Sequence, residues 1–189
     1  MEEEVREQFK RVELEDNDGM ISVGMDTYGV TSASHNYPIL KTIGTTFCVS
    51  TALYSPDRKI AGLMHMTPPS ITLDLEGTQQ SLLNILGAME RNGVDSSIRQ
   101  EIEAHIIGGV GEIGLVKRKI VMQVLNRLGI KRVLTNEEAG GNLVNFAIDA
   151  RSGEVFNLIN IRSLDNHTRT GTVKPKGGVQ LTGDPKSLK

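Results

Sequence analysis

The residues best suited to chemistry in this chain are its single cysteine, Cys48, and a histidine that follows it, His65. A cysteine thiolate is a strong nucleophile, and an imidazole within hydrogen-bonding reach can take up and return its proton. A free cysteine has a pKa of about 8.5, and a neighbouring imidazolium stabilises its thiolate form. The two residues therefore predict nucleophilic catalysis in which His65 activates Cys48.

The segment between these residues resembles two strands joined by a tight turn. Residues 55–58, Ser-Pro-Asp-Arg, suit a type I turn with Pro56 at its second position. A hairpin closed on Pro56 and Asp57 would set Cys48 directly opposite His65, with Cβ atoms about 5 Å apart on one face of the sheet. A shift of one residue would send the two side chains to opposite faces.

A simpler interpretation competes with the catalytic one. Judged on residue types alone, a lone cysteine in a β-rich core is better explained as a small apolar side chain, and His65 as a partly buried histidine. The remaining histidines, His35, His105 and His167, have no spacing typical of metal ligands. We therefore expect no metal site.

The elements that must position the pair follow from the spacing of apolar residues. We expect helices over residues 76–92 and 115–128, each with apolar residues at helical spacing and each followed by a glycine, Gly93 or Gly129. Short β-type segments predict strands over 20–23, 39–43, 49–54, 60–66, 104–107, 132–135, 143–149 and 155–160. The predicted fold class is α+β, a layered mixed or antiparallel β-sheet sandwich with packed helices.

The chain is expected to hold one domain between two charged segments. Residues 1–19 are acidic, and Val5, Phe9 and Val12 have the spacing of a short leading helix. Residues 20–162 form the predicted domain. Residues 163–189 are rich in Lys, Gly, Pro, Thr and Ser, and we expect a flexible basic tail.

Charge and composition exclude several classes of protein. Lys and Arg number 21 and Asp and Glu 23, for a net charge of −2, so the chain has no overall field to attract nucleic acid. No apolar run approaches the roughly 20 residues that cross a bilayer, so no membrane insertion is expected. The acidic start lacks the pattern of a secretory signal, and the lone cysteine excludes an intramolecular disulfide. A cytoplasmic location is expected.

Residues 42–48, Thr-Ile-Gly-Thr-Thr-Phe-Cys, followed by His65, resemble the signature of the bacterial CheD-type chemoreceptor glutamine deamidases. In that family a threonine lies six residues before the nucleophilic cysteine and the catalytic histidine seventeen residues after it, as Thr42 and His65 do here. Further landmarks are similar: Leu53-Tyr54-Ser55-Pro56, Gly108-Gly109, Ile113-Gly114 and Gly140-Gly141-Asn142. The resemblance runs from about residue 20 to about residue 160 and implies a CheD-like fold, related to the core of cysteine-nucleophile toxin deamidases.

The chain also departs from the family pattern. Thr45, Thr46 and Phe47 stand where the family has Leu-Gly-Ser, so the turn that presents the cysteine and the access of substrate are expected to differ. Residues 116–117 replace the family's Arg-Asn, and the arginine after Gly-Gly-Asn is absent. The basic cluster 117–119 is expected to be a solvated helix face, with an acidic partner as the alternative. Glycine pairs are expected to serve close packing rather than substrate contact.

The resemblance implies hydrolysis of a glutamine side chain to glutamate and ammonia through a thioester, without a cofactor. Cys48 would be the nucleophile, His65 the general acid and base, and Thr42 the residue that orients the imidazole. Backbone N–H groups near Cys48, aided by Thr45 or Thr46, would stabilise the oxyanion. The implied substrate is a cytoplasmic helix of a chemoreceptor. Two alternatives stay open: a binding module that docks a CheC-type phosphatase without turnover, and a deamidase or transglutaminase-like effector acting on another protein.

Overall fold

The computed structural model describes residues 10–12, 19–67, 75–136 and 145–158 of the 189. The helical elements are α2 (Leu75–Arg91), η1, a 3₁₀ helix (Ser96–Glu101), and α3 (Gly111–Arg127). The strands are β1 (Lys10–Val12), β2 (Met20–Ser22), β3 (Thr27–Ser32), β4 (Ile39–Thr42), β5 (Val49–Ser55), β6 (Ile60–Met66), β7 (Glu103–Gly108), β8 (Arg132–Asn136), β9 (Phe146–Asp149) and β10 (Val155–Leu158).

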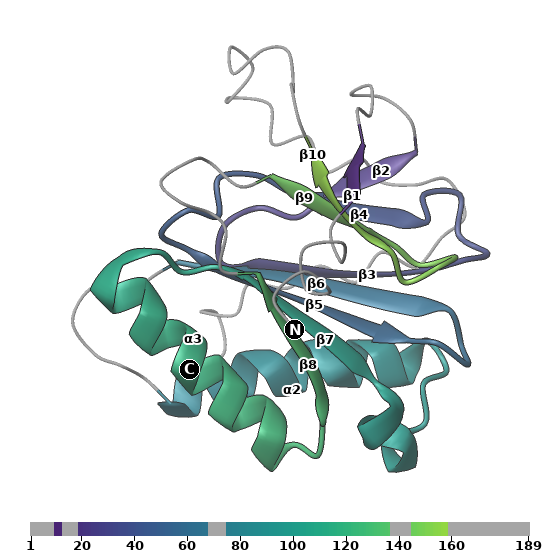
Figure 1. The fold of residues 1–189 in the computed structure, drawn as a ribbon. Helices are drawn as coiled ribbons and strands as arrows, with labels where there is room; N and C mark the ends of the chain where they lie inside the picture. Colours follow the sequence, from purple (N-terminus) through teal and green to yellow (C-terminus); the bar gives the residue numbers. More distant parts are fainter. Residues whose placement is uncertain (1–9, 13–18, 68–74, 137–144, 159–189) are drawn as a thin grey trace.

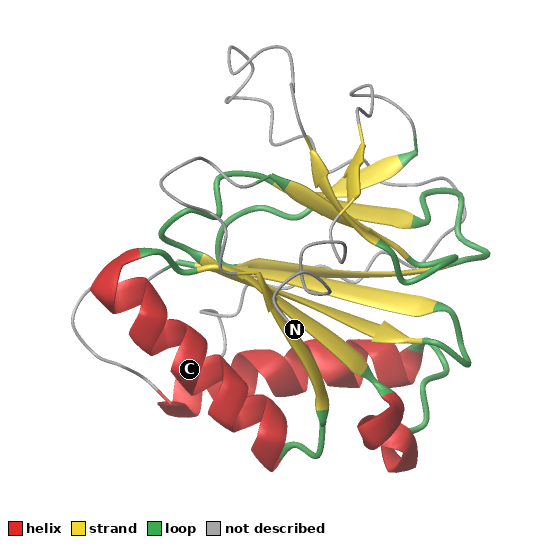
Figure 2. Ribbon diagram, viewed as in Figure 1, coloured by secondary structure: helices red, strands yellow, loops and turns green. Residues whose placement is uncertain are grey.

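The strands form two five-stranded sheets that pack face to face, and both long helices cover the outer face of one of them (Figures 1 and 2). The helix-covered sheet has the order β3-β6-β5-β7-β8, and the second sheet has the order β1-β10-β9-β4-β2. Each sheet combines parallel and antiparallel pairs. The predicted α+β class with two layered, mixed sheets and packed helices is therefore confirmed.

Side-chain alternation in β5 and β6 divides the core into two parts, one on each face of the helix-covered sheet. Val49, Leu53 and Met64 pack with the helices. Ala52 and Leu63 pack instead against the second sheet. Since successive side chains of a strand point to opposite faces, the even positions of β5 and the odd positions of β6 lie between the two sheets.

The β5–β6 hairpin has a different register from the predicted one. Ser55 pairs with Ile60, so the turn spans residues 56–59 rather than closing on Pro56 and Asp57. Lys59 has φ +52°, and this left-handed residue lengthens the connection. The resulting shift is two residues, so Ser50 rather than Cys48 lies directly opposite His65. The predicted direct pairing was wrong, but a shift of two keeps both residues on the same face.

Both helices end where glycines predicted their ends. Val94 N–H donates to the Met89 carbonyl and Ile130 N–H to the Leu125 carbonyl, across glycines in the left-handed conformation, Gly93 with φ +104° and Gly129 with φ +88°. This is the Schellman arrangement, in which glycine avoids the steric penalty on a Cβ atom.

Helix α3 begins at Gly111, four residues before the predicted start. The buried face of its early turns therefore includes residues that were predicted to face solvent. Lys117 and Arg118 lie on this face and are buried, and Lys117 Nζ donates a 2.6 Å hydrogen bond to Thr78 Oγ1 of α2. Lys119 is exposed. The expectation of a solvated basic cluster over 117–119 was therefore wrong for two of its three members, because they share the helical spacing of Gly114 and Val121.

Two parts of the sequence were misassigned or missed. The described part of the leading segment, Lys10–Val12, is a strand parallel to β10 rather than part of a helix. Strand β3 was missed because its sequence, Thr-Tyr-Gly-Val-Thr-Ser, has few apolar residues, although it pairs with all of β6 except Met66. Residues 163–189 and the landmark Gly140-Gly141-Asn142 lie outside the described residues. No helix among the described residues is both long and apolar enough to cross a membrane.

Gly62 tests the packing of β6 against α2. A Cβ atom at Gly62 would lie 2.9 Å from two carbon atoms of Ile85. We expect Gly62→Ala to lower the free energy of unfolding by about 1–3 kcal/mol, because the added methyl group overpacks the core. Urea unfolding monitored by circular dichroism measures this change.

The matched control is Gly87→Ala within α2, where the nearest atom to an added Cβ is Arg91 Nη1 at 3.5 Å. This substitution should raise stability by about 0.5–1 kcal/mol because alanine favours a helix interior. Equal stability of the Gly62 variant and the parent would contradict the described contact.

Candidate functional site

The loop that carries Cys48 is held by backbone hydrogen bonds to the segment that leads from β7 into α3. Gly109 N–H donates to the Cys48 carbonyl at 2.7 Å, and Val110 N–H donates to the Thr46 carbonyl at 2.9 Å. The first of these bonds continues the β5–β7 ladder by one residue beyond the Val49–Gly108 pair. Cys48 therefore keeps a strand-like placement although it precedes β5.

Glycine 108 permits the close approach of these two backbone segments. Its φ is +82°, and a Cβ atom there would overlap the carbonyl oxygens of Thr45 and Cys48. Gly114 makes a similar contact with the backbone of Gly109. The close-packing role predicted for the first glycine pair is therefore supported by the geometry.

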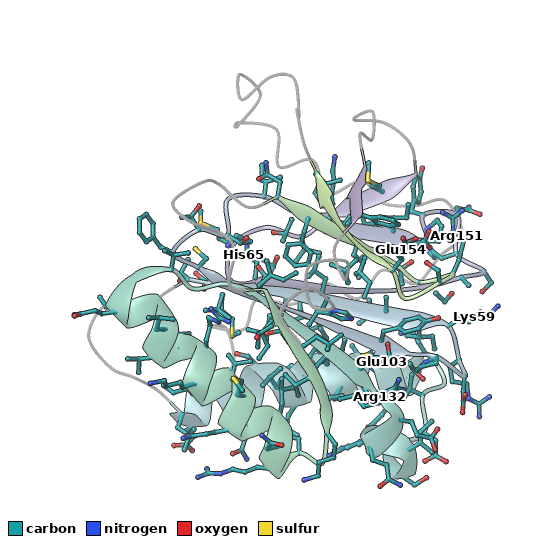
Figure 3. The ribbon with its side chains drawn as sticks, viewed as in Figure 1. Lys59, His65, Glu103, Arg132, Arg151 and Glu154 are labelled. Carbon is teal, nitrogen blue, oxygen red and sulfur yellow. The ribbon has the colours of Figure 1, made fainter. Side chains whose placement is uncertain are left out.

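Thr42 and His65 come from different sheets and meet between them. Thr42 is the last residue of β4 in the second sheet, and its Oγ1 lies 2.8 Å from Nδ1 of His65 on β6. Both side chains are buried, at 2% and 1% exposure. Figure 3 shows His65 at the end of the sheets where α3 begins, opposite the end marked by Lys59.

The tautomer of His65 follows from this hydrogen bond. The Thr42 hydroxyl donates its one hydrogen to the Val23 carbonyl at 2.8 Å, so toward His65 it can only accept. The imidazole must therefore carry its hydrogen on Nδ1, and Nε2 has a free lone pair. Nε2 is buried and makes no hydrogen bond with a described residue. This arrangement is that of a general base ready to accept a proton.

Cys48 and His65 face the same space but do not form a hydrogen bond. The β5–β6 register, extended by one residue, sets Cys48 opposite Thr67 and diagonal to His65. Diagonal neighbours on one face have Cα atoms roughly 7–8 Å apart, within reach of long side chains. Catalytic hydrogen bonds are often long in the absence of substrate and tighten when it binds. The pairing is thus compatible with proton transfer after a small movement.

Ser50 shares a sheet face with these residues and was not foreseen from the sequence. It is directly opposite His65, it is fully buried, and its Oγ makes no hydrogen bond with a described residue. A buried hydroxyl without a partner is destabilising by about 1–3 kcal/mol. Two such polar atoms, Ser50 Oγ and His65 Nε2, on neighbouring positions indicate a place where a polar ligand can bind.

Burial sets the protonation of both reactive groups. Desolvation lowers the pKa of His65 to about 4, against a smaller opposite effect of Asp26. Burial also raises the pKa of the Cys48 thiol, and the negative charge of Asp26 raises it further. At neutral pH the pair is therefore a neutral thiol and a neutral imidazole. Both shifts disfavour the charged forms, so they do not support the expected resting thiolate beside an imidazolium, and the activation of Cys48 by His65 stays a prediction.

Asp26 is the second residue that sequence reasoning missed. It lies in the turn before β3, and its backbone N–H donates to the His65 carbonyl at 2.7 Å. Its φ is +54°, a conformation that aspartate and asparagine tolerate better than most residues. A turn signal was present in the sequence at residues 24–26, but nothing in it indicated contact with residue 65.

The remaining predicted residues lie around the cysteine. Thr45 and Thr46 are buried, whereas Phe47 is 66% exposed. Ile43 at the start of the loop and Ile113 in the first turn of α3 are also exposed. Gly44 N–H donates to Oδ1 of Asn145 at 3.0 Å, which ties the loop to the residue before β9. No group of three or more His, Cys, Asp and Glu residues suited to a metal ion occurs within the described residues.

The comparisons with known proteins point to one family. A protein of Desulforamulus reducens named "Probable chemoreceptor glutamine deamidase CheD" is 27% identical over 158 residues, which cover 76% of this chain and 93% of that protein. A protein of the same name from Clostridium novyi is 26% identical over 118 residues, covering 54% and 71%. The resemblance to the CheD-type deamidases is thereby confirmed, although no family model matches the chain.

A solved structure, the Bacillus licheniformis hypothetical protein YfiH, is similar over 59% of this chain with a TM-score of 0.40 and 17% identity. The similarity spans half of that protein.

The His65 tautomer can be tested by ¹⁵N NMR of selectively labelled histidine. At pH 7 we expect a protonated Nδ1 and an unprotonated Nε2, with a titration midpoint near 4 rather than 6.5. Thr42→Val should mix the two tautomers, because it removes the acceptor that holds the hydrogen on Nδ1. His35, which is only partly buried, provides the internal reference. A protonated Nε2 in the parent protein would contradict the assignment.

Reactivity of the thiol provides a second test. The rate of Cys48 alkylation by iodoacetamide should rise with a pH midpoint above the pKa of free cysteine, about 8.5, because burial disfavours the thiolate. The rate is followed by intact mass over a range of pH, with glutathione as the free-thiol control. Alkylation with a midpoint below pH 8 would show that the resting thiol is ionised.

Proposed function

We propose that this chain is a protein glutamine deamidase in which Cys48 attacks the substrate, His65 transfers protons and Thr42 orients the imidazole. The observation that carries the proposal is the Thr42–His65 hydrogen bond, since it leaves Nε2 unprotonated between the sheets. The named relatives support the reaction class. The proposed fold relationship is to the CheD-type enzymes and to the related core of toxin deamidases.

The first half of the reaction forms a thioester. As Cys48 Sγ bonds to the carboxamide carbon of a glutamine side chain, its proton moves to Nε2 of His65. The tetrahedral intermediate carries its negative charge on the former carbonyl oxygen, where backbone N–H groups near Cys48 or the hydroxyls of Thr45 and Thr46 would stabilise it. The C–N bond then breaks, and the proton on Nε2 passes to the departing nitrogen, which leaves as ammonia.

The second half hydrolyses the thioester. His65 Nε2 removes a proton from a water molecule as the water oxygen attacks the thioester carbon. The C–S bond breaks, the proton returns to Cys48 sulfur, and the substrate leaves as glutamate. Glutamine and water are thus converted to glutamate and ammonia without a cofactor. A neutral thiol and imidazole at rest suit this general-base route, because the charged pair needs to form only when substrate is bound.

The substrate proposed from the resemblance is a glutamine on a cytoplasmic chemoreceptor helix. The surface near Cys48 supports a protein substrate, since Ile43, Phe47 and Ile113 are 42%, 66% and 57% exposed. Large exposed apolar side chains around a polar site are typical of surfaces that contact another protein. Phe47 stands where the family has a small residue, so its bulk would select among substrate helices.

A second candidate function is a binding module that docks a CheC-type phosphatase without turnover. Two observations favour it. Cys48 is only 8% exposed, and the Cys48 thiol makes no hydrogen bond with Nε2 of His65. A module of this kind would keep the apolar surface near Phe47 but would not need an ionisable thiol. Activity separates the two functions, because only the deamidase releases ammonia.

The test is incubation of the purified chain with glutamine-containing receptor helices, followed by mass spectrometry for the gain of about 1 Da that converts glutamine to glutamate. Cys48→Ala should abolish the change, and His65→Ala should lower kcat by about 10²–10⁴-fold. Thr42→Val should lower kcat about fivefold, since a hydrogen bond contributes about 1 kcal/mol.

The matched control is His35→Ala, which replaces a histidine in the connection between β3 and β4, at the end of β3 far from its pairing with His65, and should leave kcat unchanged. Equal ammonia release by the parent and Cys48→Ala would remove Cys48 as the nucleophile. Binding of a CheC-type phosphatase without any mass change in receptors or other proteins would favour the binding module. Deamidation of a protein other than a receptor would retain the chemistry and change the target.

A further inference from the structure

Asp26 contacts the chain at the His65 carbonyl and at Thr67, two residues later. Its N–H donates to the His65 carbonyl at 2.7 Å, and its carboxylate Oδ1 accepts from Thr67 N–H at 3.1 Å and from Thr67 Oγ1 at 2.8 Å. The second carboxylate oxygen lies 3.0 Å from the same hydroxyl. These bonds hold the chain at and just beyond the end of β6, where the strand ladder no longer constrains it.

Thr42, which is hydrogen-bonded to the His65 ring, carries no charge that could stabilise an imidazolium. Thr42 fixes the ring through a neutral hydroxyl, whereas the imidazole must become positive when it accepts the thiol proton. A positive charge at a side chain that is 1% exposed is costly unless a negative group lies nearby. Among the described residues, Asp26 is the charged group whose field acts on both His65 and Cys48.

We propose that Asp26 is a positioning residue of the Cys48–His65 pair, which fixes the end of β6 through Thr67 and stabilises the imidazolium during turnover. The proposal rests on the function proposed above. Once Cys48 sulfur is bonded to the substrate carbon, the negative charge lies on the former carbonyl oxygen, where N–H or hydroxyl groups near Cys48 would stabilise it. The imidazolium formed at the same time is buried, and Asp26 is the described charged group that acts on it. The carboxylate would therefore act in turnover by offsetting the positive charge of the buried imidazolium.

The same charge has an opposite and separately measurable effect on the resting protein. Asp26 raises the pKa of the Cys48 thiol, so removing the charge should lower that pKa. Removal of the Asp26 charge should therefore lower the pKa of the Cys48 thiol and also slow the proposed deamidation. A residue with a purely structural role would not produce this combination.

Asp26→Asn is the sharpest variant. Asparagine keeps an acceptor oxygen for Thr67, tolerates the left-handed backbone and removes only the charge. We expect the midpoint of Cys48 alkylation to move down by about one pH unit and kcat to fall about tenfold, with little change in KM. The matched control is Asp57→Asn, the same change of charge at an exposed residue in the β5–β6 turn, which should alter neither quantity.

A second variant keeps the test decisive if Asp26→Asn does not fold. Asp26→Gly also removes the charge and adopts the left-handed conformation without strain, so it should give the same shift in alkylation. Thr67→Val removes a hydrogen bond but keeps the carboxylate, and it should lower kcat without moving the alkylation midpoint.

The alkylation measurement needs no substrate, so its outcome is independent of the proposed function. A parent protein without deamidase activity would overturn that function, while a lowered alkylation midpoint in Asp26→Asn would still support the electrostatic link. An unchanged midpoint together with unchanged kcat would overturn the role of Asp26. A lowered midpoint with unchanged kcat in an active enzyme would overturn its role in turnover.

Discussion

The packing of the two sheets is the constraint on which the candidate site depends. Thr42 belongs to one sheet and His65 to the other, so their hydrogen bond exists only while the sheets keep their relative position. An apolar layer that includes Leu40, Leu63 and Phe146 fills the space beside them and is almost fully buried. Burial of this layer maintains the spacing of two polar groups, and the same burial keeps both reactive side chains neutral.

The cysteine depends on a different set of contacts. Its loop rests on the backbone of the β7–α3 connection, which glycines at positions 108, 109 and 114 allow to pass close by. Side chains at these positions would push the loop outward. The proposed nucleophile and base are thus placed by different contacts, close backbone packing for Cys48 and sheet-on-sheet packing for His65. Both residues lie on the face of the helix-covered sheet that is turned toward the second sheet.

Sequence patterns predicted the elements of regular structure better than their pairing. Apolar spacing and glycine stops located α2 and α3, and the β-type segments found most strands. The hairpin register was wrong by two residues because nothing in the sequence showed that Lys59 adopts a left-handed conformation. The prediction that Cys48 and His65 lie on one sheet face still held, because side-chain direction repeats every two residues. Asp26 and Ser50 escaped notice because their significance comes only from partners distant in sequence.

The buried, neutral state of Cys48 has a further consequence for the durability of the protein. Oxidation by peroxide begins with attack by a thiolate, and its first product is a sulfenic acid. A thiol that is protonated and shielded from solvent reacts slowly in this way. As the only cysteine of the 189 residues, it also has no neighbour with which to form a disulfide within the chain. If Cys48 is the nucleophile as proposed, its thiolate would form mainly when substrate arrives, and the thiol would be protected against oxidative loss between substrates.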